Sequence, residues 1–208
     1  MRVAIVGGTG KFGRPLAARL RDSGIDVALG SRDAERGREV ARELGVEGGS
    51  NEEVVRGADL VVLAVQSRAA LDTARELADA IGTTPLLCVA SDLTFTPNGV
   101  LPGRGVESLA EQVAEVVSGP VAAGLHALPA AHLAAEELPD DDVLVCGDDE
   151  EAKRLALDLA GHLVVGRALD AGPLANARGL EGMTAVILNL NRRYGGAASI
   201  RITGLRSP

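Results

Sequence analysis

The fold of this chain is decided by its first thirteen residues, Met1-Arg-Val-Ala-Ile-Val-Gly-Gly-Thr-Gly-Lys-Phe-Gly13. The apolar run Arg2–Val6 predicts a buried β-strand, and a helix pattern, Lys11–Ser23, follows it directly. A glycine-rich turn between a strand and a helix is typical of phosphate-binding loops, because free backbone N–H groups and the positive end of the helix dipole face the phosphates. The stretch therefore predicts a dinucleotide site, and a glycine turn without a ligand is the alternative.

The glycines of this loop follow the pattern G-x-G-x-x-G at Gly8, Gly10 and Gly13. The first glycine is expected to adopt a backbone conformation that other residues avoid, and the second to let a pyrophosphate approach the backbone. The third is expected to let the helix pack closely on the strand. The predicted nucleotide contacts of the loop are Gly8, Thr9, Gly10, Lys11, Phe12 and Gly13.

Beyond this loop, short apolar runs alternate with helix patterns. Such alternation predicts an α/β fold with a Rossmann-type doubly wound, mostly parallel sheet. Strands or extended segments are predicted at Arg2–Val6, Ile25–Gly30, Val46–Gly48, Leu60–Val65, Pro85–Ala90, Val121–Leu125, Val143–Cys146 and Val164–Leu169. Helices are predicted at Lys11–Ser23, Ala34–Leu44, Asn51–Val55, Arg68–Ile81, Val106–Val117, Glu150–His162 and Asn176–Tyr194.

The last part of the chain differs from the alternating part. We expect residues 1–172 to form the nucleotide-binding domain and residues 173–208 to form a small C-terminal helical segment. In its tail, Ser199–Thr203 could add an edge strand. The segment Ser91–Gly105 is rich in Gly, Pro, Thr and Asp, which predicts a functional loop. The acidic run Asp140–Asp142 is interpreted as a solvated loop.

The composition excludes several classes of partner. The chain has 208 residues, 46% of them apolar, but only 1% are aromatic, which argues against stacking on single-stranded nucleic acid. Its formal charge of −8 argues against binding to DNA or to an anionic membrane surface. Cys88 and Cys146 lie in apolar runs, so we expect two buried thiols in a cytoplasmic protein. No signal peptide, membrane span or metal-ligand spacing is visible in the sequence.

The end of the second predicted strand indicates which nucleotide binds. An NAD site places a carboxylate there to hold the ribose 2′-OH, whereas this chain has Ser31 and Arg32. Arg36 lies four residues further on, on the same helical face as Arg32. Guanidinium groups suit a 2′-phosphate, so Ser31, Arg32 and Arg36 predict NADP(H). Because Asp33 and Glu35 are adjacent, an ordinary charged helix turn is the alternative.

Ligands of this fold sit beyond the carboxyl ends of the strands, so the residues that follow each strand are candidates. They are Gln66–Arg68, Ser91–Asp92 and His126, which we expect to line the nicotinamide end of the crevice. His126 could contact a second substrate or be a structural loop histidine. For His132 we expect a surface or structural role.

These residues carry a resemblance that spans nearly the whole chain. It resembles the coenzyme F420-dependent NADP oxidoreductases, in the opening Met1–Gly10 and in Gly30–Arg32. The more specific parts of the match are Leu125-His-Ala-Leu-Pro-Ala-Ala131, Val145–Asp149, Leu169–Leu174 and the helix from Asn176 to Asn191. At Asp92 the sequence departs from the family pattern, which puts a carboxylate near the expected second pocket.

The resemblance implies hydride transfer between nicotinamide C4 and C5 of the 8-hydroxy-5-deazaflavin coenzyme F420. It implies that Thr9, Ser31, Arg32 and Arg36 hold NADP, and that His126 and Leu128 lie near the stacked rings. It also implies that Arg178 and Thr184 meet the deazaflavin, with packing of the helix surface as the alternative role, and it favours a homodimer.

Two other functions fit the same fold. An NADPH-dependent reductase of a small carbonyl or imine would need a proton donor near the nicotinamide, for which only His126 or Asp92 is available. A non-catalytic NADP-binding module would bind NADPH and turn over no substrate.

Overall fold

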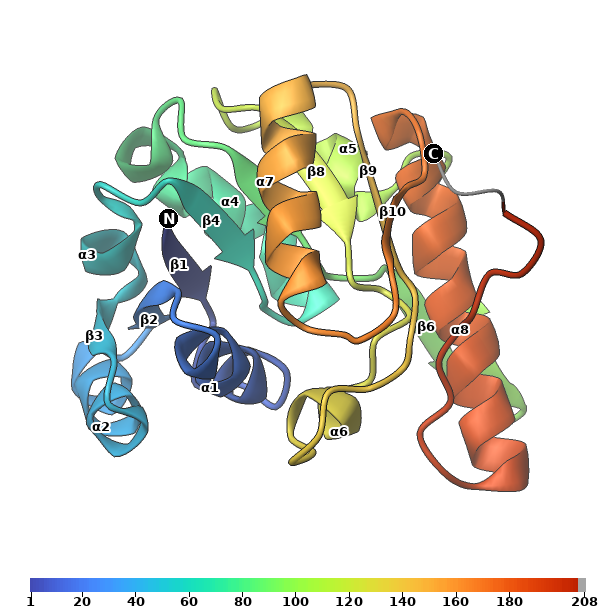
Figure 1. The fold of residues 1–208 in the computed structure, drawn as a ribbon. Coiled ribbons are helices and arrows are strands. Elements are labelled where there is room, and N and C mark those ends of the chain that lie inside the picture. Colours follow the sequence, from blue (N-terminus) through green and yellow to red (C-terminus); the bar gives the residue numbers. More distant parts are fainter. Residues whose placement is uncertain (206–208) are drawn as a thin grey trace.

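The computed structural model describes residues 1–205 and has a central sheet covered by helices (Figure 1). The strands of this sheet are β1 (Arg2–Val6), β2 (Asp26–Ser31), β3 (Glu47–Ser50), β4 (Leu60–Leu63), β5 (Leu86–Cys88), β8 (Val121–Gly124), β9 (Val143–Gly147) and β10 (Ala168–Asp170). The helices are α1 (Gly13–Asp22), α2 (Ala34–Leu44), α3 (Asn51–Val55), α4 (Ser67–Ile81), α5 (Leu109–Ala114), α6 (Ala130–Leu133), α7 (Glu150–Gly161) and α8 (Ala177–Tyr194). A short 3₁₀ turn, Leu174–Asn176, precedes α8.

The strand order confirms the Rossmann-type prediction. The sheet runs β10-β9-β8-β5-β4-β1-β2-β3, and all pairs from β3 to β8 are parallel. The last two strands run in the opposite direction, since β9 pairs antiparallel to β8 and β10 lies parallel to β9. The strand order changes direction between β1 and β4, so a crevice is expected beyond the carboxyl ends of these two strands.

Helices cover both faces of the sheet, which explains the continuous apolar strand runs. On β1, Val3 and Ile5 belong to a buried cluster with α1, α2 and α7. Ala4 and Val6 belong to a second cluster with α3, α4 and α5. The alternation of side chains along one strand thus supplies both layers of the core. Within residues 1–205, no helix is long and apolar enough to cross a membrane.

The segment predicted to be the loop Ser91–Gly105 contains a β-hairpin, so that prediction is corrected. Its strands are β6 (Leu93–Thr96) and β7 (Gly99–Pro102), paired antiparallel. The hairpin packs on α8, where the Asn189 side chain accepts a hydrogen bond from Val100 N at 2.9 Å and donates one to Val100 O at 2.7 Å. An amide side chain can satisfy both backbone groups of one edge residue, so α8 holds the hairpin in place.

Several predicted boundaries also change. The first helix begins at Gly13 instead of Lys11, because the residues before it form the glycine turn. The helix expected at Val106–Val117 shortens to α5, which begins after a capping box between Ser108 and Glu111. The segment predicted as extended, Val164–Leu169, forms a strand only from Ala168, and that strand includes Asp170. The long C-terminal helix is confirmed as α8.

The acidic run predicted to be solvated contains buried carboxylates, and one of them, Asp142, pairs with the partly exposed side chain of Arg167. Asp142 is 1% exposed, and its carboxylate accepts hydrogen bonds from Arg167 Nε at 3.1 Å and Arg167 Nη2 at 2.6 Å. It also accepts one from Ile202 N at 2.7 Å, and Asp142 N donates to Ile200 O at 2.9 Å. The expected edge strand Ser199–Thr203 is therefore an irregular tail that is bound to Asp142 instead of to a sheet edge. His132, 2.6 Å from Asp141, has the structural role expected of it.

Candidate functional site

The phosphate loop lies at the carboxyl end of β1, where the sequence placed it. The residue with a left-handed backbone is Gly7, at φ +79°, one position before the predicted Gly8. Gly8 is required for a different reason, because a Cβ there would lie 2.5 Å from Leu29 Cγ. Gly8 N also donates to Gly30 O at 2.9 Å, which joins the loop to the end of β2. The two expected phosphate sites are thus held side by side.

Of the other two glycines, Gly13 has the predicted packing role, and the role of Gly10 stays a prediction. A Cβ at Gly13 would lie 2.6 Å from Gly7 O and 2.7 Å from Gly8 Cα, so only glycine lets α1 pack this closely on the loop. A Cβ at Gly10 would lie near only one atom, Gly7 O, at 3.1 Å. The remaining space beside Gly10 is open, and a pyrophosphate could approach the backbone there. This cradle fits a dinucleotide.

At the end of β2, the three residues predicted to recognise the 2′-phosphate have different surroundings. Ser31 is buried, and its hydroxyl accepts a hydrogen bond from Asp33 N at 3.3 Å. Arg32 is exposed, and no carboxylate within residues 1–205 lies at ion-pair distance from it. Arg36 pairs with Glu39 at 2.7 Å, with both side chains about half exposed. Such surface pairs are worth at most about 1 kcal/mol, so Arg36 can exchange Glu39 for a phosphate.

A cleft of about 730 Å³ extends from the phosphate loop to α8. Its walls come from the end of the phosphate loop at Phe12, the β4–α4 junction, the segment from the end of β5 through β6, the loop after β8, and α8. Representative lining residues are Phe12, Arg68, Phe95, His126, Leu128 and Thr184. Residues from five separate parts of the chain therefore face one space, and the predicted contacts His126, Leu128 and Thr184 are among them.

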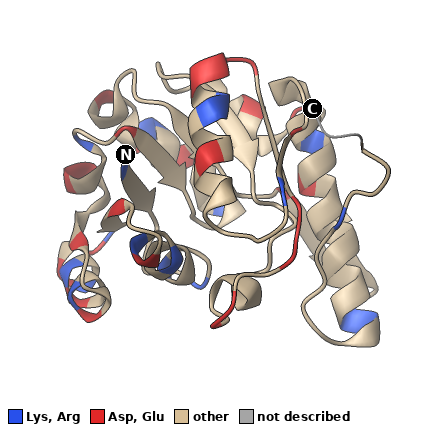
Figure 2. Cartoon of the chain, viewed as in Figure 1, with Lys and Arg blue, Asp and Glu red and all other residues tan. Residues whose placement is uncertain are grey.

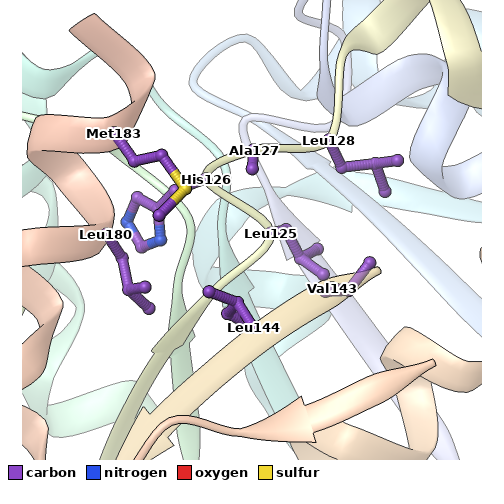
Figure 3. Close-up of a pocket in the computed structure, with 8 residues that line it drawn as sticks. All are labelled: Leu125, His126, Ala127, Leu128, Val143, Leu144, Leu180 and Met183. Carbon is purple, nitrogen blue, oxygen red and sulfur yellow. The ribbon is translucent and has the colours of Figure 1, made fainter. Parts of the chain in front are cut away.

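His126 lies at the inner wall of the cleft. The preceding Leu125 has φ +65°, a strained conformation for a branched residue, and such strain is typical of functional loops. The His126 ring lies beside Leu180 and Met183 of α8 (Figure 3). Its Nε2 is 3.3 Å from Ala90 O, and a carbonyl only accepts, so Nε2 carries the hydrogen.

The other ring nitrogen of His126 lacks a partner. Nδ1 is buried, and no donor within the described chain reaches it. Burial lowers the pKa of His126 to about 4, so the ring is neutral at physiological pH. A neutral ring with a hydrogen on Nε2 presents Nδ1 as a free acceptor, and a buried free acceptor suits an N–H group of a bound ligand.

Thr184 connects α8 to the segments that follow β5 and β8 at the cleft. Its hydroxyl donates to His126 O at 2.9 Å, so it can accept the hydrogen of Ser91 Oγ, also at 2.9 Å. The middle of α8, from Gly182 to Asn191, carries no charge (Figure 2). The cleft wall on this side is therefore apolar and fixed by hydrogen bonds to the His126 loop.

Arg178 and Asp92 lie outside the cleft. Both line a neighbouring cavity of about 530 Å³, together with Glu107 and Glu181. Glu181 is buried and accepts hydrogen bonds from Asp92 N at 3.0 Å and Leu109 N at 2.8 Å, while burial raises its pKa. The structure thus separates Arg178 from Thr184, although the resemblance implies one ligand for both. The contact of Arg178 with the deazaflavin stays a prediction.

Sequence reasoning did not place the β6–β7 hairpin in the cleft. Leu93 and Phe95 of β6 line it, as do Ile187 and Asn191 of α8. A signal for the hairpin was present, because Leu93–Thr96 alternates apolar and polar residues and runs into the turn formers Pro97-Asn-Gly99.

The cysteines take no part in the cleft. Cys88 and Cys146 are buried free thiols, as expected, and burial raises the pKa of each to about 12. They are therefore poor nucleophiles at physiological pH. In the described part of the chain, no group of three or more His, Cys, Asp and Glu residues is arranged to hold a metal ion.

Known proteins resemble this chain over its whole length. A family model described as NADP oxidoreductase, coenzyme F420-dependent, matches residues 2–88. The F420-dependent NADP reductase of Methanothermobacter thermautotrophicus is 34% identical over 99% of this chain and 96% of its own length. The F420-dependent NADP reductase of Methanocaldococcus jannaschii is 33% identical over 99% of each chain.

A solved structure gives the same result. The crystal structure of a protein from Arthrobacter sp. FB24, provisionally assigned as an F420-dependent NADP reductase, matches with a TM-score of 0.84. It is 25% identical and covers 98% of this chain and 100% of that chain. The phosphate loop, the cleft and the full-length similarity together lead to one conclusion: this protein belongs to the family of coenzyme F420-dependent NADP oxidoreductases.

Proposed function

We propose that the protein transfers a hydride between NADP(H) and coenzyme F420 within the cleft. The observation that carries this proposal is that one cleft joins the phosphate loop to the neutral wall of α8 and the His126 loop. One end can bind a dinucleotide through backbone N–H groups, and the other can hold a flat aromatic ring between apolar side chains.

The reaction needs little acid–base chemistry from the protein. The dihydronicotinamide supplies a hydride from C4, a C–H bond forms at deazaflavin C5, and a proton from water is taken up at the reduced ring. Both reacting carbons belong to coenzymes, so the protein contributes orientation and excludes water. His126 suits such a role, because its neutral Nδ1 can accept a ligand N–H while Leu128 fills the adjacent wall.

A carbonyl or imine reductase of the same fold is less well supported. It would need a proton donor beside the nicotinamide. His126 has a pKa of about 4 and uses Nε2–H on Ala90 O, while Asp92 lies in the neighbouring cavity. Neither residue is therefore placed to supply a proton in the cleft.

We further propose that the segment 173–208, of which residues 206–208 lie outside the described part of the chain, supplies the second side of the cleft through α8. We also propose that the protein is a homodimer and that it acts in the cytoplasm. Support for a dimer comes from apolar side chains left exposed on the hairpin and on α8, including Phe95 at 74% and Val186 at 58% exposure. The two unpaired thiols support a reducing compartment. Light scattering of the purified protein measures the number of subunits.

One spectroscopic experiment tests the reaction. The protein is mixed with NADPH and oxidised F420, and the visible absorption band of the deazaflavin is followed. We expect bleaching with NADPH and little bleaching with NADH. If the protein bound NADPH but did not bleach the deazaflavin band, the proposed reaction would be refuted. The protein would then be a nucleotide-binding module or a reductase of another substrate.

Arg178→Ala tests the remaining site prediction. If Arg178 contacts the deazaflavin, the Kd for F420 should rise by about tenfold, as expected for loss of one hydrogen bond to a charged group, with the Kd for NADPH unchanged. Fluorescence titration measures both constants. An unchanged Kd for F420 would mean that the coenzyme stays within the cleft. A higher Kd for NADPH would mean that Arg178 contacts the nucleotide and not the deazaflavin.

A further inference from the structure

Arg68 has no role in the reaction described so far, although it lines the cleft. It lies in the first turn of α4, directly beyond the carboxyl end of β4. The side chain is exposed, and no carboxylate among residues 1–205 lies at ion-pair distance from it. By contrast, Arg75 on the same helix pairs with Asp72 at 3.3 Å. Arg68 therefore directs an uncompensated charge at the cleft.

Arg68 is also the single formal charge in the cleft wall, as far as the described residues form it. The other lining residues are apolar or uncharged, and His126 is neutral because its pKa is about 4. The chain as a whole has a net charge of −8, and its carboxylates repel anions. An anionic ligand in this cleft therefore finds one attractive side chain.

The start of α4 adds to this attraction. Its N-cap residue Gln66 makes no side-chain hydrogen bond to the helix, and the first turn contains no acidic residue. The positive end of the helix dipole and the free N–H groups at Ser67 and Arg68 therefore face the same space. His126 lines the same cleft, and its buried Nδ1 has no partner among the described residues, which independently indicates a ligand that the protein itself does not supply.

The anionic groups of NADP have sites elsewhere. The pyrophosphate matches the loop at Gly10, and the 2′-phosphate matches Ser31 and Arg32 at the end of β2. Coenzyme F420 is also an anion, since its ribityl chain continues into a phosphodiester and glutamyl carboxylates. No site assigned so far accounts for these groups.

We propose that Arg68, with the N-terminus of α4, binds the phosphodiester or a carboxylate on the side chain of F420. This inference rests on the proposed function. Arg178 is a weaker site for an anion, because Asp92, Glu107 and Glu181 line the same cavity and their carboxylates outnumber it. Arg68 thus selects the complete coenzyme over the bare deazaflavin, whereas the apolar wall recognises the ring.

The experiment compares F420 with FO, the ribityl deazaflavin that lacks the phosphodiester and glutamyl groups. Wild-type protein, Arg68→Ala and Arg75→Ala are each titrated with F420, FO and NADPH by fluorescence, and KM and kcat are measured with both deazaflavins. For Arg68→Ala we expect the Kd and KM for F420 to rise about five- to tenfold. The values for FO and NADPH should stay within twofold of wild type.

The Arg75→Ala variant is the matched control, because Arg75 lies on the same helix and outside the cleft. It should leave all three affinities unchanged. Added salt should weaken F420 binding to the wild type more than to Arg68→Ala. If Arg68→Ala lost equal affinity for F420 and FO, or lost affinity only for NADPH, the assignment of Arg68 would be overturned. Failure of the wild type to reduce F420 would instead refute the proposed function.

Discussion

Arg32→Asp is expected to lower kcat/KM for NADPH by about a hundredfold. The substitution removes a hydrogen bond between charged groups and adds repulsion between the aspartate and the 2′-phosphate. The exposed guanidinium of Arg32 has no carboxylate partner within the described chain, so it is available for a 2′-phosphate. An aspartate there repels that phosphate, and its carboxylate can accept a hydrogen bond from the ribose 2′-OH of NADH. Steady-state kinetics with F420 and each nucleotide measure the change, and kcat/KM for NADH should fall little or rise.

Arg38→Ala is the control for this substitution. Arg38 lies on α2 close to Arg32 in sequence, but it pairs with Glu53 at 2.9 Å. Its loss should leave the preference for NADPH intact. If Arg32→Asp left the Michaelis constants for both nucleotides unchanged, Arg32 would not be the 2′-phosphate contact. The charged helix turn considered as the alternative would then describe this segment.

Asp142→Ala should lower the free energy of unfolding by about 2–3 kcal/mol, because it removes a buried carboxylate that accepts hydrogen bonds from both Arg167 and Ile202 N. For a chain of this size the melting temperature should fall by about 5–10 °C. The loss should also release the tail from Arg167, which donates to Ile202 O. Thermal unfolding by circular dichroism measures the effect.

Asp140→Ala is the matched control, two residues away. Asp140 forms an ion pair with Arg201, but its side chain is 74% exposed, so its loss should change the free energy of unfolding by less than about 1 kcal/mol. Equal destabilisation by the two substitutions would show that burial of Asp142 contributes nothing.

The same ion pair predicts a pH dependence. Arg167 and the backbone donors lower the pKa of Asp142 below its ordinary value of 3.8. The unfolded chain therefore binds the proton first as the pH falls, so this stabilisation is complete above about pH 4 and is lost below it. The slope of stability against pH below pH 4 should be shallower in Asp142→Ala than in the wild type.

The sequence carries no evident set of acid–base catalytic side chains, and the cleft explains why. Transfer of a hydride between two coenzymes depends on their distance and orientation. The hydrogen bonds from Thr184 to His126 O and between Ser91 and Thr184 hold the walls in place, and none of these groups needs to exchange a proton.

Two expectations fail for a common physical reason. The acidic neighbours of Asp142 predict a solvated side chain, but its burial depends on Arg167 and Ile202, which are distant in the chain. The strands of the hairpin are short, and they are stabilised by Asn189 of α8 as well as by each other, so the local pattern predicts only a loop. In each case the deciding partner lies far along the sequence.

The sequence by itself determined the Rossmann-type fold and the position of the phosphate loop. The packing role of Gly13 could be read from it because strand, turn and helix are adjacent in the chain, and local sterics decide their conformation. The tertiary structure alone decided that Arg68, Phe95, His126 and Thr184 share one cleft while Arg178 faces another. That separation depends on how α8 and the hairpin pack beside the sheet, and such long-range packing is set by burial and by paired hydrogen bonds that no local pattern encodes.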